Sequence, residues 1–208
     1  MRKTRLILII IGALYCVIAI PLVLYYGREF IGWEAIVIAI SCIFLVVFVF
    51  YMISLKKYKQ IYESYQRHQL DETLLLCKKL LKWNLNIGFR QNSYYIMAVI
   101  YFERNDDIHY EAAMSHVDLK KILPLKYYWQ VVAFLVNDHL VEARESYRKF
   151  LDSLQHIRKR SIYEKHETIL KSIFNFIDHK DEETLFNLKD SLQKTQSPRI
   201  RTYIESLL

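Results

Sequence analysis

Two long apolar runs near the start of the chain limit its fold more than any other feature. Residues 6–25 contain no charged side chain over 20 positions, and residues 36–53 form a second uncharged run of 18, rich in Val, Ile and Phe. As helices these runs would each rise roughly 30 Å, enough to cross the hydrocarbon core of a bilayer. Only ten residues, YGREFIGWEA, separate them. We therefore expect residues 1–54 to form a transmembrane helical hairpin.

The basic residues that flank the two runs predict an orientation. Three precede the first run and three follow the second, whereas the connecting loop contains one. Because basic flanks are retained on the cytoplasmic side, we expect both termini to be cytoplasmic, in an integral protein of the plasma membrane of a bacterium. These residues are Arg2, Lys3 and Arg5, then Arg28 in the loop, and finally Lys56, Lys57 and Lys59.

Two further expectations concern the membrane part. The first run could instead belong to a cleaved signal peptide, since MRKTR is a basic start. The run is longer than a usual signal core, no A-x-A-like site follows, and a second run comes at once, so the hairpin is the better interpretation. We expect Lys56, Lys57 and Lys59 to contact anionic lipid head groups, where each basic residue contributes about 1 kcal/mol.

Residues 55–208 have the pattern of an all-α, water-facing domain of net charge +5. They contain one glycine and two prolines, and their apolar residues recur at spacings of three and four rather than two. The first predicted helix has no breaker between it and the second apolar run, so one helix can continue from the membrane into the domain. The predicted helices are 55–68, 70–83, 91–104, 109–122, 125–137, 139–154, 160–179, 182–195 and 198–207.

One stretch of the domain, AVIYFERNDDIHYEAAMSHVDLKKILP, resembles a tetratricopeptide repeat. It has Ala98 and Tyr101 on a first helix, a polar turn, the small residue Ala112 on a second helix, and Pro124 at its end. A similar unit follows, with Tyr127, Ala133, Ala143, Tyr147 and Phe150. The resemblance implies an array of antiparallel helical hairpins over 55–208 behind the two-span hairpin. The unit steps depart from the regular repeat of 34 residues, and an irregular helical bundle is the competing fold.

No pattern in the chain indicates a catalytic centre, a metal site or a cofactor. His109 and His116 share a helical face without a further ligand set, and the acidic pairs lie where helices are expected to begin, as N-caps do. Cys16, Cys42 and Cys77 lack C-x-x-C spacing, so we expect free thiols. The run IRKR ending at Arg160 could bind nucleic acid, but a modest net charge makes nucleic acid an unexpected partner.

One face of a predicted helix is a candidate partner-binding groove. Four residues of this face follow one another at spacings of three and four: Tyr94, Met97, Tyr101 and Arg104. Tyr128 occupies an equivalent place on the first helix of the next repeat unit. In tetratricopeptide-like arrays such helices line a concave surface, and Tyr, Met and Arg are frequent in interface hot spots. The alternative is that this face is core.

The sequence therefore predicts a non-enzymatic, membrane-anchored interaction module. In this interpretation the hairpin holds a helical scaffold at the inner face of the membrane, where it binds a protein or peptide, itself membrane-associated, as an adaptor or accessory subunit. The alternative function is a component of a membrane enzyme or transporter. Two spans are too few for a self-contained permease, and polar residues within them are nearly absent. The sequence leaves the oligomeric state open.

Overall fold

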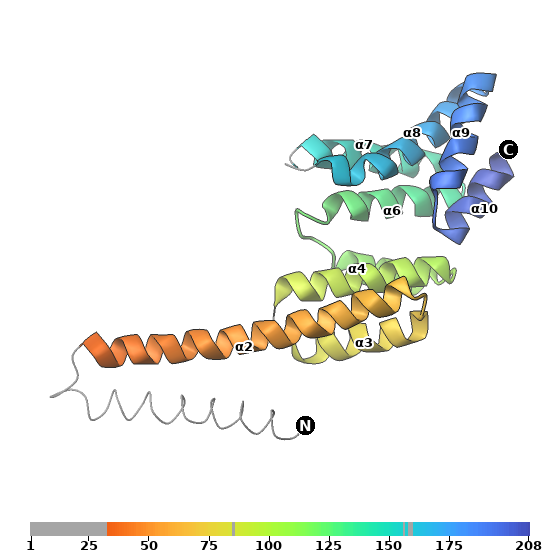
Figure 1. Ribbon diagram of the computed structural model, residues 1–208. Coiled ribbons are helices and arrows are strands. Elements are labelled where there is room, and N and C mark those ends of the chain that lie inside the picture. Colours follow the sequence, from red (N-terminus) through yellow and green to blue (C-terminus); the bar gives the residue numbers. More distant parts are fainter. Residues whose placement is uncertain (1–32, 85, 156, 158–159) are drawn as a thin grey trace. The chain divides into compact units, whose positions relative to one another are not determined.

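The computed structural model describes residues 33–84, 86–155, 157 and 160–208, so the predicted first span over residues 6–25 and its basic flank lie outside the described part. Everything described is helix, turn or loop, without a strand, as the apolar spacing predicts (Figure 1). The helices are α2 (Trp33–Gln66), α3 (Leu70–Trp83), α4 (Ile87–Glu103), α5 (Asp107–Ser115), α6 (Leu123–Val136), α7 (Leu140–Gln155), η1 (Arg160–Tyr163), α8 (Glu164–His179), α9 (Glu182–Lys194) and α10 (Pro198–Leu207).

Helix α2 joins the second predicted span and the first predicted domain helix into one element of 34 residues. Its stretch Ile40–Gln66 is long and apolar enough to cross a membrane, and it is the one such stretch among the described residues. Its apolar side chains are mostly exposed; Phe44, for example, is 71% exposed. The structure does not test the two-span hairpin, because the first run is not described.

The described chain divides within α2 into two compact units, one ending at Glu63 and one over Ser64–Leu208. We call the second the helical unit. The division falls nine positions after the predicted boundary at residue 54, because α2 continues without interruption past that point.

Consecutive helices of the helical unit pair as hairpins: α4 with α5, α6 with α7, and α8 with α9. Three of its tight turns repeat one geometry, with His68, Asn105 and Asp138 in the left-handed conformation. After each of these residues a backbone N–H reaches the carbonyl five positions back, at 3.1, 3.0 and 2.8 Å. This pattern satisfies helix-terminal carbonyls in Schellman-type caps. The recurrence agrees with an array of hairpins, while the tetratricopeptide-type arrangement stays a prediction.

The core of the helical unit lies between these hairpins. Its largest fully buried side chains come from every hairpin and from the last helix, and they include Phe102, Phe150, Leu170, Leu188 and Ile204. Helix α10 packs against α6 and α9, so the end of the chain closes over earlier helices.

One predicted helix, 109–122, is too long. Helix α5 begins at Asp107, where the Asp106 side chain accepts a hydrogen bond from the backbone N–H of His109 at 3.2 Å, and it ends at Ser115. Val117 and Ile122 continue the apolar spacing and are buried, but they lie in the non-helical connection between α5 and α6. Pro124, expected to end this helix, instead lies in the first turn of α6, where its missing N–H is not needed.

Candidate functional site

The structure places three of the five predicted groove residues in the core. Met97, Tyr101 and Tyr128 are 7%, 9% and 3% exposed. The Tyr128 ring meets the His166 ring edge-on with centroids 4.5 Å apart. Burial also raises the pKa of Tyr128 above its ordinary value. These three side chains therefore match the alternative, a core face, and they do not form an open groove in this structure.

The other two predicted groove residues keep contact with solvent. Tyr94 is half-buried and its ring stacks on that of His116, with centroids 4.3 Å apart. Arg104 is exposed and its Nη2 lies 2.9 Å from Asp71 Oδ1. Partner binding stays a prediction for these two residues; Tyr94 lies in the middle of α4, and Arg104 directly follows its last residue.

Neighbouring aromatic residues that the sequence reasoning did not select join α4 to α6. The indole Nε1 of Trp129 donates a hydrogen bond to the hydroxyl of Tyr95 at 3.0 Å. Trp129 also packs on Phe102, with ring centroids 5.3 Å apart. The signal that could have found the first pair is its separation of 34 residues, the period of the suspected repeat.

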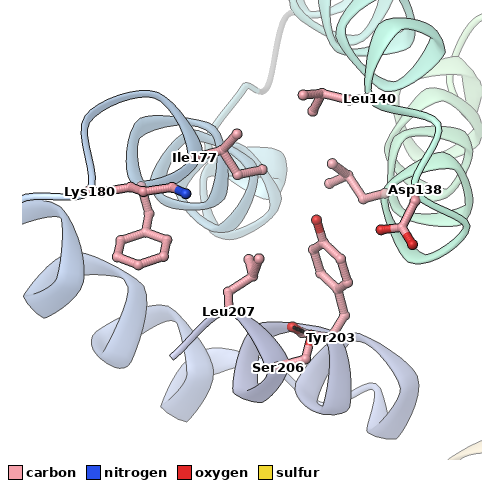
Figure 2. Close-up of a pocket in the computed structure, with 9 residues that line it drawn as sticks. Asp138, Leu140, Ile177, Lys180, Tyr203, Ser206 and Leu207 are labelled. Carbon is pink, nitrogen blue, oxygen red and sulfur yellow. Dashed lines mark hydrogen bonds between the residues drawn. The ribbon is translucent and has the colours of Figure 1, made fainter.

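A pocket of about 530 Å³ lies beneath α10 (Figure 2). It lies between the α6–α7 turn, the end of α8 and the last two turns of α10. Most of its wall is apolar, and four lining residues bring a charge or a hydroxyl. The lining residues are Leu135, Asp138, Leu140, Phe176, Ile177, Lys180, Tyr203, Ser206 and Leu207.

Polar groups enter this pocket from three sides. In Figure 2 the Tyr203 hydroxyl rises from α10 into the space between Asp138 and Ile177. The pKa of Tyr203 is raised, first by burial and then by the negative charge of Asp138. Asp138 and Lys180 are both in the left-handed conformation, and no ion pair involves either of them within the described part of the chain. A ligand can therefore meet a carboxylate, an ammonium group and apolar walls at once.

Sequence reasoning missed this pocket because its walls come from turns about 40 residues apart and from the end of the chain. In the sequence, residues 137–139 and 179–181 stand out only as short polar segments between predicted helices. Their convergence depends on α10 folding back over them, which no local pattern predicts.

The predicted head-group lysines lie on α2 shortly after the uncharged run of residues 36–53, within the stretch Ile40–Gln66. Lys56, Lys57 and Lys59 are all exposed. Lys59 also lies 3.7 Å from Glu63, one helical turn later. Their contact with lipid stays a prediction.

The histidines considered as metal ligands have other partners. His109 Nδ1 lies 2.8 Å from Asp106 Oδ1 at the start of α5, and His116 stacks on Tyr94. Within the described residues, His, Cys, Asp and Glu side chains do not gather in groups of three or more that could hold a metal ion.

Comparison with protein-family models, with curated proteins and with solved structures found no match. Function therefore rests on the geometry and chemistry of the chain's own residues.

Proposed function

We propose that this chain is a membrane-anchored interaction module. A two-span hairpin over residues 6–25 and 36–53 holds it in the membrane, both termini are cytoplasmic, and the helical unit binds a protein or peptide as an adaptor or accessory subunit of a membrane complex. The observation that carries the proposal is the exposed apolar stretch of α2, which leads without a break into a charged helical unit.

Physical chemistry supports a bilayer as the solvent of this stretch. Exposure of Ile, Leu, Val and Phe side chains to water is unfavourable, whereas at the centre of a membrane helix each contributes roughly −0.3 to −0.6 kcal/mol to insertion. The helix satisfies its own backbone groups, as a spanning segment must. Directly after the uncharged run of residues 36–53, the Ser54 hydroxyl donates to the Phe50 carbonyl at 2.8 Å, which satisfies that polar group internally.

Long-range contacts support a repeat-like helical array for the binding part. Tyr95 and Trp129, and also Arg144 and Asp178, are joined across 34 residues, while Asp71 and Arg104 are joined across 33. Tyr95 and Trp129 lie on α4 and α6, the first helices of successive hairpins. The other two pairs each join the start of one helix, α3 or α7, to the end of the next helix, α4 or α8. Arrays of this kind offer extended surfaces to protein partners.

The pocket beneath α10 is the best candidate for partner contact. Its volume suits one or two apolar side chains, and its polar groups can orient the backbone or charged neighbours of a bound segment. A peptide that inserts an apolar side chain between Leu140 and Ile177 can pair a basic residue with Asp138 and an acidic one with Lys180.

Membrane anchoring is tested by extraction and by reporter fusions. The full chain should stay in the membrane pellet at alkaline pH. Fusions at residues 3 and 208 should report the cytoplasm, and a fusion at Phe30 the exterior. Release of the chain by alkali, or an exterior reading at residue 208, would overturn the proposal.

Partner binding is tested by filling the pocket. Ser206 is exposed and lines the pocket, so Ser206→Trp places a large ring there without opening the core. Thr202→Trp is the matched control, because Thr202 is exposed one turn earlier on α10 and does not line the pocket. Partners that co-purify from mild detergent should be lost with Ser206→Trp and retained with Thr202→Trp. Equal retention by both variants would remove the pocket from the proposal.

A further inference from the structure

The helical unit has two chemically different ends. Hydrogen bonds bring three connections together at one end, those from α3 to α4, from α5 to α6 and from α7 to α8. Arg90 at the start of α4 donates to the Leu81 carbonyl at 3.0 Å, and the backbone N–H of Asp118 donates to Gln91 Oε1 at 2.9 Å. The Tyr163 hydroxyl in turn donates to the Lys121 carbonyl at 2.8 Å. We call this the basic end, made of residues 82–84, 86–91, 117–126 and 160–167.

The tight turns lie at the opposite end of the hairpins (Figure 1). Arg104 joins the first of them to the second through Asp71, and α10 lies across the others. We call this the turn end, made of residues 67–72, 103–108, 137–142 and 178–183.

The two ends carry opposite charge. The basic end has seven Lys and Arg residues against three acidic ones, which gives a net charge of +4. The turn end has three basic residues against eleven acidic ones, which gives −8. A unit whose charges are separated in this way has a preferred orientation beside any charged surface.

Preferences at helix starts explain most of the acidic residues of the turn end, but not the cations of the basic end. Acidic residues at the turn end lie at the starts of α3, α5, α7 and α9, where the helix dipole favours negative charge. At the basic end the relation is reversed for α4 and α6, because Arg90 and Lys126 lie in their first turns, which contain no acidic residue. Helix α8, which also begins at this end, has Glu164 and Glu167 in its first turn. Their hydrogen bonds to backbone carbonyls satisfy donors but leave the positive charges unneutralised.

The remaining cations of this end are exposed lysines. Lys82, Lys120, Lys121 and Lys165 are exposed, and none takes part in an ion pair with another described residue. Arg160, by contrast, is occupied by Glu167 at 2.7 Å. We propose that this basic end lies against the anionic head groups of the bilayer that holds α2, with the turn end directed away from the membrane. This inference rests on the proposed membrane anchoring.

The chemistry of the end favours a lipid surface over nucleic acid. Its uncommitted charges are all lysines, which act as point charges toward phosphate, while its two arginines are engaged within the protein. The lysines lie at the end of α3, in the α5–α6 connection and at the start of α8, and they are not aligned on one helix that could enter a groove. The anchor itself holds the unit beside a charged plane, so weak contributions from several lysines suffice.

Differential acylation of lysines tests the proposed orientation. The full chain is placed in nanodiscs of phosphatidylcholine alone or of phosphatidylcholine with phosphatidylglycerol, and each lysine is followed by mass spectrometry with an amine-acylating reagent. In the anionic discs Lys82, Lys120, Lys121 and Lys165 should react more slowly, by roughly fivefold each. Lys171, Lys180 and Lys189, outside the basic end, should keep their rates. High salt should remove the difference, because it screens exposed charges.

Charge reversal supplies the matched variants. Changing Lys82, Lys120 and Lys121 each to Glu should abolish the protection of Lys165 in anionic discs, whereas Lys171→Glu with Lys189→Glu should preserve it. Insertion into the discs is scored first and tests the anchor separately. An inserted chain whose lysines react equally in both kinds of disc overturns the inference, and so does protection by added RNA in place of anionic lipid.

Discussion

Arg199 of α10 forms an ion pair with Asp107 of α5, its Nη1 lying 2.9 Å from Asp107 Oδ1. The same nitrogen donates to the Phe102 carbonyl at 3.0 Å, and the guanidinium stands 4.3 Å from the centre of the Phe102 ring. The Arg199 side chain is only 12% exposed. One residue thus attaches the last helix to α4 and α5, some 90 residues earlier in the chain.

Replacing Arg199 by Ala should destabilise the helical unit. The change removes two hydrogen bonds and a cation–π contact, and it leaves the Phe102 carbonyl without this donor, which together cost about 2–3 kcal/mol. For a domain of this size that corresponds to a melting temperature lower by roughly 4–12 °C, measured by circular dichroism in detergent. Arg201→Ala is the control, because Arg201 is exposed and its bond to the Thr195 carbonyl is long, at 3.5 Å. Similar melting of both variants would contradict the assigned role.

Cys77 should be unreactive until the helical unit unfolds. Its side chain is fully buried, and burial raises the pKa of its thiol to about 12. Near pH 8 only about one thiol in ten thousand would be ionised, and the thiolate is the nucleophile. Maleimide labelling followed by mass spectrometry should therefore modify the Cys77 peptide only in denaturant. Rapid labelling under native conditions would show that α3 opens locally.

Sequence patterns predicted the helices well where local chemistry defines their ends. Helix α9 starts at a capping box formed by Asp181 and Thr184, and α10 starts at the N-cap Ser197 followed by Pro198. The predicted starts at 182 and 198 agree with both. After Ser115 the helix was predicted from apolar spacing alone. That spacing predicted the buried positions correctly but the helix incorrectly, because a buried connection can have the same spacing.

The site residues were harder to predict, because an amphipathic pattern does not distinguish a face buried against other helices from a face that binds a partner. Tyr101 and Tyr128 have the composition of a hot spot, yet other helices of the chain surround them. The pocket and the Arg199–Asp107 pair depend on contacts between segments about 40 to 90 residues apart. Such contacts follow from the packing of whole hairpins and leave no local sequence signal.

Truncation of Tyr101 or Tyr128 should now lower stability. Each Tyr→Ala change removes a buried ring, which typically costs roughly 3–5 kcal/mol. Tyr94→Ala is the comparison. The Tyr94 ring is half-buried and stacks on His116, so its removal should lower the stability less. Thermal melting and partner capture should be measured on the same samples. Lost capture by the Tyr101 or Tyr128 variant with unchanged melting would restore the groove hypothesis for those residues.

His166 links the stability of the helical unit to pH. Its Nδ1 is buried without a hydrogen-bond partner, and its ring meets the edge of the Tyr128 ring. Burial, and secondarily the positive charge of Lys165, lower the pKa of His166 from 6.5 to about 4. The folded protein therefore holds this imidazole neutral over a pH range in which the unfolded chain protonates it.

The contribution of His166 to stability should consequently be complete above about pH 6.5, fall as the pH decreases toward 4, and level off below that, because only the unfolded state gains the proton within this window. A lowering of this size corresponds to at most about 3 kcal/mol. The wild-type chain and His166→Phe, which keeps a ring against Tyr128 but cannot titrate, should be melted in parallel at about pH 7 and about pH 4.5. The wild type should lose more of its melting temperature than the variant. Equal losses would mean that His166 is hydrated in solution and titrates normally.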